Sequence, residues 1–461
     1  MPLIKSISGI RGTIGGAAGD NLTPQDIVEC SAAFGYWTLK KTGNNKIVVG
    51  RDARISGEIV ANLAINTLQS LGIDVVDLGL STTPTVEMAV VAENAGAGII
   101  FTASHNPKEW NALKFLNQKG EFISGEDGKE VLDLIESGDI QYAGVTKLGS
   151  YSKNDTYIDY HIKEILALEL VDIAVVKKRG FKIVVDCINS TGALSIPPLL
   201  EKLGCEYVLI NDTPNGQFDH NPEPLPQNLM RLSKKVQDER ADLGIVVDPD
   251  VDRLAFVTED GEMFGEEYTL VAVADYVLSK KFGTTVSNLS STRALKDVTE
   301  KKHGSKYFAS AVGEVNVVRT MKENNAVIGG EGNGGIILPE LHYGRDALVG
   351  IALFLTHLAA SGKPASFLRK SYPHYVISKN KIQLRPEIDL DAIFEQLAEK
   401  YKKYDQSRID GLKINIDSDW IHLRKSNTEP IIRIYSESSS GVIANNLANK
   451  IKADINDVIK G

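Results

Sequence analysis

Residues 98–107 read GIIFTASHNP, an apolar strand that ends in a short polar loop. In α/β sheets, ligands gather outside the carboxyl ends of the strands, which is where this loop would lie. A serine hydroxyl at that place can carry a transferred group covalently and so divide one difficult step into two. Ser104 is therefore a candidate nucleophile, with His105 beside it. The alternative is an ordinary Asn-Pro turn that happens to contain a serine.

The preceding residues alternate between helix and strand patterns. Thr23, Pro24 and Asp26 predict a capped helix start, and that helix extends to about residue 41. Apolar spacing then predicts a strand over 46–50, a helix over 57–71, a strand over 73–78 and a helix over 84–93. This alternation is typical of a layered α/β domain.

The pattern restarts twice and then changes. Strands at 182–186 and 206–210 flank a helix near 196–203, and 241–257 reads as strand, turn, strand after a proline-rich loop at 212–226. A third set has helices over 268–281 and 345–360, with strands near Val286 and Tyr307 and over 327–329. The last 90 or so residues predict an antiparallel α+β domain, with strands at 378–384, 411–416, 420–424 and 431–436 and helices at 390–402 and 442–459. We expect domains over 1–150, 151–258, 259–372 and 373–461.

Composition narrows the class of protein. The 461 residues are 43% hydrophobic and 24% charged, with a net charge of −9, which argues against nucleic acid or an anionic membrane as a partner. The sequence has no run of about 18 apolar residues and no apolar core of a signal peptide at its start. Cys30, Cys187 and Cys205 are widely spaced and are expected to be buried, reduced thiols. A cytoplasmic monomer or homodimer is expected.

Asp248, Asp250 and Asp252 follow a strand-like segment at 244–247. Carboxylates at i, i+2 and i+4 can converge on one hard divalent cation if the segment loops, and Mg²⁺ suits a site that handles phosphate. A calcium loop is rejected because Arg253 stands where its sharp turn needs glycine and because the flanks are strand-like. A solvated acidic turn is the other alternative, although three such charges repel each other unless a cation relieves them.

Other loops carry candidate ligand-binding groups. Glu331 and Asn333 stand among glycines at 329–335, which suits sugar hydroxyls, although a plain glycine turn is the alternative. Residues 424–430 read RKSNTEP and, with Arg433, offer the donors of a phosphate cradle. A solvated hairpin turn is the alternative there. Arg11 in SGIRG, the stretch GRDAR at 50–54 and Lys114 in NALK could be no more than glycine turns and a solvated lysine.

Four of these loops together resemble the α-D-phosphohexomutase superfamily over essentially the whole chain: TASHNP, DPDVDR, GEGNGG and RKSNTEP, in that order. The resemblance implies three similar α/β domains with mixed sheets between helices, and a fourth α+β domain like the TATA-box-binding protein. The four loops would meet in a central cleft. It also implies an enzyme that interconverts a hexose 6-phosphate and a 1-phosphate through phosphoserine and a hexose 1,6-bisphosphate.

The resemblance also implies a role for each candidate residue. Ser104 would be phosphorylated, and Mg²⁺ would be bound by Asp248, Asp250, Asp252 and Ser104. Arg253 would contact the transferred phosphate, His105 would orient the serine loop, and Arg11 and Lys114 would act near the reacting oxygen. The remaining residues would bind the substrate: Glu331 and Asn333 its hydroxyls, and Arg424, Ser426, Asn427, Thr428 and Arg433 its other phosphate.

The GEGNGG loop that ends at Gly335, called the sugar loop below, departs from the sequence found in part of the family. Several members end this loop with a histidine, and here that position is Gly335, so its acid/base role is absent or is supplied by Lys114, Arg11 or His342. The GEGNGG form looks like phosphoglucosamine mutases, which makes glucosamine phosphate the expected substrate. Phosphomannomutase or phosphoglucomutase activity is the alternative. Two further hypotheses are a metal-dependent serine phosphatase and a non-catalytic sugar-phosphate binding protein.

Overall fold

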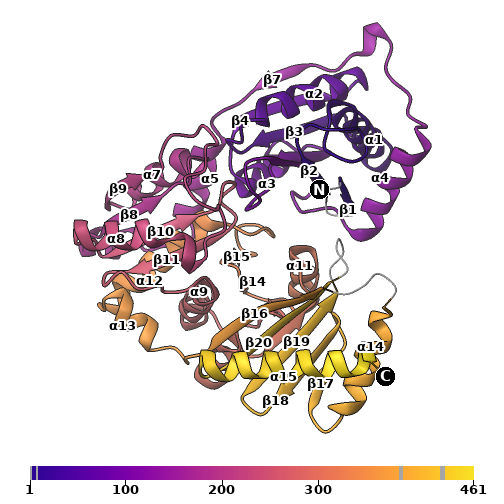
Figure 1. Cartoon of the computed structure of the whole chain (residues 1–461). Coiled ribbons are helices and arrows are strands. Elements are labelled where there is room, and N and C mark those ends of the chain that lie inside the picture. Colours follow the sequence, from indigo (N-terminus) through magenta and orange to yellow (C-terminus); the bar gives the residue numbers. More distant parts are fainter. Residues whose placement is uncertain (1–2, 7–8, 384–387, 426–430, 461) are drawn as a thin grey trace.

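The computed structural model describes residues 3–6, 9–383, 388–425 and 431–460. Four sheets follow one another along the chain and are arranged on an arc (Figure 1). The N-terminal part, in indigo, and the C-terminal part, in yellow, lie at the two ends of this arc. Within the described ranges, no helix combines the length and the apolar character needed to cross a membrane.

The first sheet has seven strands in the order β1-β2-β6-β5-β3-β4-β7. Its strands are β1 (Ile4–Ser6), β2 (Gly9–Thr13), β3 (Lys46–Arg51), β4 (Asp74–Leu80), β5 (Ala97–Phe101), β6 (Trp110–Asn117) and β7 (Tyr151–Lys153). Its helices are α1 (Pro24–Thr42), α2 (Gly57–Ser70), α3 (Thr83–Ala92) and α4 (Gly125–Ser137), with a 3-10 turn at Val145–Lys147. Strand β3 is parallel to β4 and β5, whereas β6 is antiparallel to β5 and β2, so the sheet is mixed.

Helices cover both faces of this sheet. Successive strand residues point to opposite faces, and Ile99 and Ile100 accordingly enter two different clusters of buried side chains. Ile99 shares its cluster with Phe34 of α1, whereas Ile100 shares its cluster with Val86 of α3. The loop that follows β5 therefore leaves a strand that is held from both sides.

The second sheet has the order β11-β10-β8-β9 and is also mixed. Its strands are β8 (Lys182–Asp186), β9 (Glu206–Ile210), β10 (Leu243–Val247) and β11 (Leu254–Thr258), and only β11 is antiparallel to its neighbour. Its helices are α5 (Tyr157–Leu166), α6 (Ile173–Arg179), α7 (Gly192–Lys202) and α8 (Met230–Glu239), with a 3-10 turn at Pro226–Asn228.

The third sheet repeats this plan in the order β13-β12-β14-β15. Its strands are β12 (Thr285–Asn288), β13 (Tyr307–Ser310), β14 (Ile328–Glu331) and β15 (Gly335–Ile337). Its helices are α9 (Glu266–Lys280), α10 (Ala294–Asp297) with a π-helical turn at Val298–Lys302, α11 (Glu314–Glu323), α12 (Ala347–Ser361) and α13 (Ala365–Lys370).

The fourth sheet is antiparallel throughout, in the order β16-β20-β19-β18-β17. Its elements are β16 (Val376–Gln383), α14 (Leu390–Lys400), β17 (Asp405–Ser407), β18 (Leu412–Ile416), β19 (Asp419–Lys425), β20 (Ile431–Ser438) and α15 (Gly441–Lys460). Ile421 and Leu423 pack with both helices, whereas Trp420 and His422 point to the opposite face. The expected fold class, three α/β units with mixed sheets and a C-terminal α+β unit, is confirmed.

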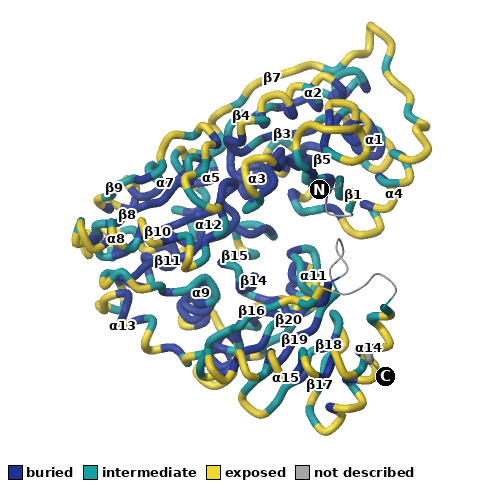
Figure 2. Tube along the Cα trace, viewed as in Figure 1, coloured by how far each residue is buried: buried dark blue, intermediate teal, exposed yellow. Residues whose placement is uncertain are grey.

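The second and third units share one continuous core. One large cluster of buried apolar side chains runs through both, from Ile162 to Tyr372, beside a smaller cluster in each unit. Helix α12 is buried along most of its length between them (Figure 2). The boundary expected at 258 therefore crosses one core, and the first sheet extends slightly past 150, because β7 pairs with β4.

Three predictions from the sequence can be compared with the structure: two helix starts and the state of the cysteines. The predicted helix start at Pro24 is confirmed, and the Asp26 carboxylate accepts a hydrogen bond of 3.0 Å from the backbone N–H of Thr23. The helix expected from residue 345 instead begins at Ala347, because Asp346 caps it by accepting from the N–H groups of Leu348 and Val349. The three cysteines are buried and unpaired, as expected.

Candidate active site

Ser104 lies in a strained loop directly after β5. Its φ of 49° is in the left-handed region, which non-glycine residues rarely adopt. The conformation is held because the Ser104 N–H donates to Thr102 Oγ1 at 2.9 Å, and Thr102 Oγ1 donates to Asp52 Oδ2 at 2.6 Å. Local strain that the surrounding contacts maintain is typical of a functional residue.

Arg54 holds the rest of this loop in place through hydrogen bonds. Its side chain is completely buried and pairs with Asp52 at 3.0 Å. Its guanidinium donates to backbone carbonyls along the loop, those of Ser104, Asn106, Pro107 and Trp110. A planar fork of donors can satisfy several acceptors at once, so one side chain sets the path of the whole serine loop.

The serine meets the aspartate loop of the second unit. The Ser104 hydroxyl donates to Asp248 Oδ2 at 2.7 Å. The aspartate loop joins β10 to β11 and turns tightly: Val251 has a φ of 61°, and Asp248 Oδ1 accepts from the N–H groups of Asp252 and Arg253. Two loops that are far apart in the sequence thus form one site.

The three aspartates form a cluster that can hold a cation. All three are completely buried, and each offers a carboxylate oxygen within 4.8 Å of the others. Asp250 Oδ1 and Asp252 Oδ1 have no hydrogen-bond partner in the part of the chain that the structure describes. Burial, together with the charges of Asp252 and Asp250, raises the pKa of Asp248 well above its ordinary value. An all-oxygen donor set with two free buried oxygens fits a hard divalent cation.

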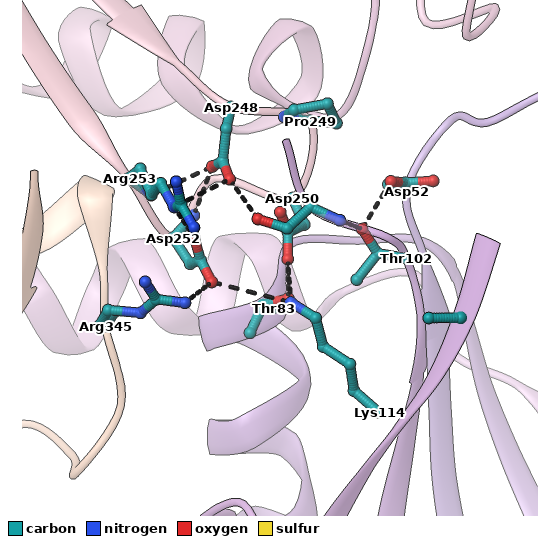
Figure 3. A network of polar contacts seen from close by, with 12 residues as sticks. Asp52, Thr83, Thr102, Lys114, Asp248, Pro249, Asp250, Asp252, Arg253 and Arg345 are labelled. Carbon is teal, nitrogen blue, oxygen red and sulfur yellow. Dashed lines mark hydrogen bonds and ion pairs between the residues drawn. The ribbon is translucent and has the colours of Figure 1, made fainter. Parts of the chain in front are cut away.

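Positive side chains surround this cluster (Figure 3). Lys114 Nζ lies 2.9 Å from Asp250 Oδ2 and 3.8 Å from Asp252 Oδ2, and Thr83 Oγ1 donates to the same Asp250 oxygen at 2.7 Å. Burial acts to lower the pKa of Lys114, but the charges of Asp250 and Asp252 outweigh it and raise the pKa. Arg253 Nε lies 3.9 Å from both Asp248 and Asp252. Lys114 is therefore a fixed cation of the site, and the solvated alternative is wrong.

Arg11 is close enough to other charged residues of the site for their charges to affect its pKa. Burial, followed by the charges of Arg253 and Arg433, lowers the pKa of its guanidinium. Arg11 lies on β2, Arg253 on the aspartate loop and Arg433 on β20. Arginines of the second and fourth units thus repel Arg11 of the first, and a bound anion would relieve this repulsion.

His105, the neighbour of Ser104, is half-buried. Burial, followed by the charges of Arg253 and Arg345, lowers the pKa of its imidazole well below the ordinary value. Its Nδ1 atom has no hydrogen-bond partner among the described residues. His105 therefore presents a neutral ring beside the serine.

The sugar loop is joined to the aspartate loop through Arg345. Glu331 is buried and accepts from Asn288 Nδ2 at 2.8 Å and from the Gly313 N–H at 3.1 Å. Arg345 Nη1 lies 3.2 Å from Glu331 Oε2, and its Nη2 lies 2.6 Å from Asp252 Oδ2. Asn333 Oδ1 instead accepts from the Gly335 N–H at 3.2 Å, within its own loop.

Three basic residues of the fourth unit, Arg408, Arg424 and Lys425, line a separate cavity together with Asp391, Glu395 and Asp410. Arg424 Nε pairs with Asp410 Oδ2 at 2.7 Å, and Arg433 is exposed on the neighbouring strand as its cross-strand partner. A cavity of about 480 Å³ lies between the third and fourth units, lined by Asn316, Arg408, Arg424 and Lys425 among others. Ser426, Asn427 and Thr428 lie outside the described residues.

His342 is tied into a second buried network. Its Nδ1 lies 3.2 Å from Glu87 Oε2 and its Nε2 lies 3.3 Å from Asp346 Oδ2, which also contacts His161 Nε2 at 2.8 Å. Burial acts against the charged ring, but Asp346 and Glu87 outweigh it and raise the pKa of His342 to about 10. Because Glu87 lies on α3, His161 on α5 and Asp346 before α12, this network joins three units.

Sequence reasoning missed four residues that the geometry makes important: Asp52, Arg54, Thr83 and Arg345. From the sequence, the stretch at 50–54 is a loop without an assigned role that could be a plain glycine turn, and Arg345 is the expected first residue of a helix. The available signal was chemical: an Arg-Asp pair directly before the apolar helix α12, and charged residues at the end of the buried strand β3.

Four family models match the chain in order, each described as phosphoglucomutase/phosphomannomutase. They cover alpha/beta/alpha domain I at 4–141, domain II at 155–261, domain III at 265–375 and the C-terminal domain at 385–453. The chain belongs to the phosphoglucomutase/phosphomannomutase family. It is thus a member of the α-D-phosphohexomutase superfamily, which supports hexose phosphate mutase activity.

Relatives extend over nearly the whole chain. A phosphoglucomutase/phosphomannomutase from Thermococcus kodakarensis is 38% identical over 437 residues, which cover 93% of this chain and 94% of that protein. A phosphoglucosamine/phosphogalactosamine mutase from Sulfurisphaera tokodaii is 32% identical and covers 96% of this chain and 97% of its own. The solved structure of a family protein from Burkholderia thailandensis superposes with a TM-score of 0.86 at 26% identity, covering 99% of this chain and 98% of that one.

The variant Arg54→Lys tests how the serine loop is held. A single ammonium cannot satisfy the carbonyls of Ser104, Asn106, Pro107 and Trp110 together, so we expect kcat for hexose phosphate isomerisation to fall about 100-fold with a small change in KM. Arg231→Lys is the matched control, because Arg231 forms an exposed ion pair with Asp219. A kcat for Arg54→Lys within twofold of wild type would show that the loop does not depend on this fork.

The variant His342→Gln tests the network between the units by its pH dependence. A folded-state pKa of about 10, above the ordinary value, adds stability that is fully present below about pH 6.5 and is lost as the pH rises toward 10. We expect the thermal midpoint of His342→Gln to lie about 5 °C below wild type at pH 6.5, and the gap to narrow toward pH 10. The exposed His374 supplies the control His374→Gln. A gap that stays constant across this range would contradict the charge assigned to His342.

Proposed function

We propose that the protein interconverts a hexose 6-phosphate and a hexose 1-phosphate through phosphorylated Ser104, with glucosamine phosphate as the preferred substrate. The observation that carries this proposal is the 2.7 Å hydrogen bond from the Ser104 hydroxyl to Asp248, one of three completely buried carboxylates. A serine placed in a strained loop against a cation-binding cluster is suited to phosphoryl transfer, in which positioning and charge neutralisation supply most of the catalysis.

The chemistry can be written from the residues of the site. In the phosphorylated protein, the free hydroxyl of the sugar phosphate attacks the phosphorus on Ser104, and the bond from phosphorus to Ser104 Oγ breaks. The hydroxyl proton ends, in the net reaction, on Ser104 Oγ, which then regains its hydrogen bond to Asp248. The product is a hexose 1,6-bisphosphate, and transfer of its other phosphoryl group back to Ser104 completes the isomerisation. Lys114, Arg253 and Arg11 stabilise the charge on the moving group.

Mg²⁺ is the ion that we propose for the carboxylate cluster. Asp248, Asp250 and Asp252 would bind it together with Ser104 Oγ, and the free oxygens of Asp250 and Asp252 support this. When bound, the ion polarises phosphoryl oxygens and neutralises their charge. Burial of the cluster keeps water away from the serine.

The phosphate that is not transferred needs a second site. We assign it to the fourth unit, where Arg424, Ser426, Asn427, Thr428 and Arg433 supply donors. The repulsion of Arg11 by Arg253 and Arg433 supports an anion near Arg11. A bisphosphate that turns over in place must exchange its two phosphates between these sites. We therefore expect the fourth unit to shift during the cycle.

The sugar hydroxyls are assigned to Glu331 and Asn333. Glu331 already accepts three hydrogen bonds, and its pKa is lowered because Arg345 and Asn288 outweigh the effect of burial. It therefore stays an ionised acceptor. Relatives named as a phosphoglucosamine/phosphogalactosamine mutase and as a phosphoglucomutase/phosphomannomutase differ in the sugar that their names give. The GEGNGG loop favours glucosamine phosphate, with mannose or glucose phosphate as the alternative.

Steady-state kinetics on glucosamine, glucose and mannose 1-phosphates test the proposal, with both the 6-phosphate product and released inorganic phosphate measured. We expect 6-phosphate formation without phosphate release, and a kcat/KM for glucosamine 1-phosphate about tenfold above the others. A preference for glucose or mannose would overturn the substrate assignment alone. Release of phosphate as fast as isomerisation would indicate a serine phosphatase, and no turnover of any sugar would favour a binding protein.

A further inference from the structure

Arg345 is a buried cation shared by three carboxylates. Its Nη2 lies 2.6 Å from Asp252, its Nη1 lies 3.2 Å from Glu331, and its Nε lies 2.9 Å from Glu314. Its backbone N–H also donates to Glu314, at 3.0 Å. Glu314, at the start of α11, thus anchors Arg345, and the two remaining nitrogens of Arg345 reach two different loops. Figure 3 shows the contact with Asp252.

The two loops are those that carry the ion and the sugar in the proposed function. Asp252 uses Oδ2 for Arg345, and its Oδ1, which has no hydrogen-bond partner among the described residues, is left for a ligand. Glu331 uses Oε2 for Arg345, and its Oε1 for Asn288 and Gly313. The arginine therefore selects which oxygen of Asp252 is free and fixes the rotation of the Glu331 carboxylate.

Gly335 provides the space for this arginine. A Cβ atom at position 335 would lie 2.4 Å from Cδ of Arg345 and 3.0 Å from its Cγ. Gly335 does not have a positive φ, so its backbone would accept an L-residue. The glycine is therefore required by the arginine that crosses it, and not by the turn of the chain.

We propose that Arg345 is a positioning residue that couples the cation-binding aspartate loop to the sugar loop, and that Gly335 is part of the same device. This inference rests on the proposed function for the identity of the two ligands. An arginine stays charged and presents a rigid fork, so it can hold both carboxylates at once. A lysine carries the same charge, but its single ammonium cannot reproduce the planar fork, so the geometry of both contacts is disturbed.

The test uses the full chain and two independent readouts. The first is the Mg²⁺ affinity of the dephosphorylated protein, measured by calorimetry. The second is KM and kcat of the phosphorylated protein for the hexose 1-phosphate turned over best. In Arg345→Lys, we expect the Kd for Mg²⁺ and the KM for sugar phosphate each to rise about tenfold, although the charge is kept. Arg319→Lys is the matched control, because Arg319 forms an exposed ion pair with Glu323. A change in only one of the two readouts would overturn the coupling.

Gly335→Ala tests the second half of the inference. This substitution removes no polar group, yet displacement of Arg345 should raise the Kd for Mg²⁺ and the KM for sugar phosphate. The double variant Arg345→Lys with Gly335→Ala should be no worse than either single variant. Gly144→Ala is the control, since a Cβ at Gly144 meets open space. Independent, multiplying effects would show that Gly335 does not act through Arg345. If Arg345→Lys fails to fold, an unchanged Mg²⁺ affinity in Gly335→Ala overturns the inference and a weakened one supports it.

These outcomes are distinct from failure of the proposed function. If the wild-type chain isomerises no hexose phosphate, the proposed function fails, while the Mg²⁺ titrations of the variants still decide whether Arg345 orients Asp252. If the wild type is an active mutase and the variants bind Mg²⁺ like wild type, the inference fails and the function stands.

Discussion

The burial of three like charges at Asp248, Asp250 and Asp252 is the constraint on which the rest of the site depends. Removing an ionised carboxylate from water costs several kcal/mol unless partners compensate it. The surrounding residues supply that compensation from different parts of the chain: Ser104, Thr83 and Lys114 from the first unit, Arg253 from the second and Arg345 from the third. Compensation is incomplete, since two carboxylate oxygens have no partner among the described residues. The cluster is thus prepared for a cation.

This requirement explains why the units are joined as they are. The compensating groups must converge on one short loop, so the first three units contribute side chains to its immediate surroundings. The second and third units share one core around α12. The network of Glu87, His342, Asp346 and His161 adds charged contacts between the first three units. The fourth unit contributes its own cavity and Arg433, and hydrogen bonds such as Ser290–His422 and Arg293–Glu437 join it to the third unit.

Much of this architecture could be predicted from the sequence, because its strands are short apolar runs that end in polar loops. The strands at 46–50 and 182–186 and the helix from Pro24 have strong local signals, and the structure places them there. Helix α8 was not predicted, because its ten residues are mostly polar and only Leu232 and Val236 among them are buried. The strand β6 was not predicted either, and Lys114 was therefore left as a possible solvated residue.

Some residues of the site could also be predicted from the sequence and others could not. Ser104 and the three aspartates could be found because their loops have a distinct composition, whereas Arg54 and Arg345 could not, because their function depends on contacts 50 or more residues away. Gly335 shows this limit most clearly. The sequence shows that position 335 lacks the histidine of several family members. Only the structure shows that Arg345 occupies the space beside this glycine.

The most direct test of the account is the intact mass of the protein after incubation with a hexose 1,6-bisphosphate and Mg²⁺. The account predicts that the wild-type chain gains the mass of one phosphoryl group, that fragmentation locates it on Ser104, and that Ser104→Ala gains none. An equal gain of mass by Ser104→Ala, or no gain by the wild type, would contradict the claim that Ser104 carries the phosphoryl group.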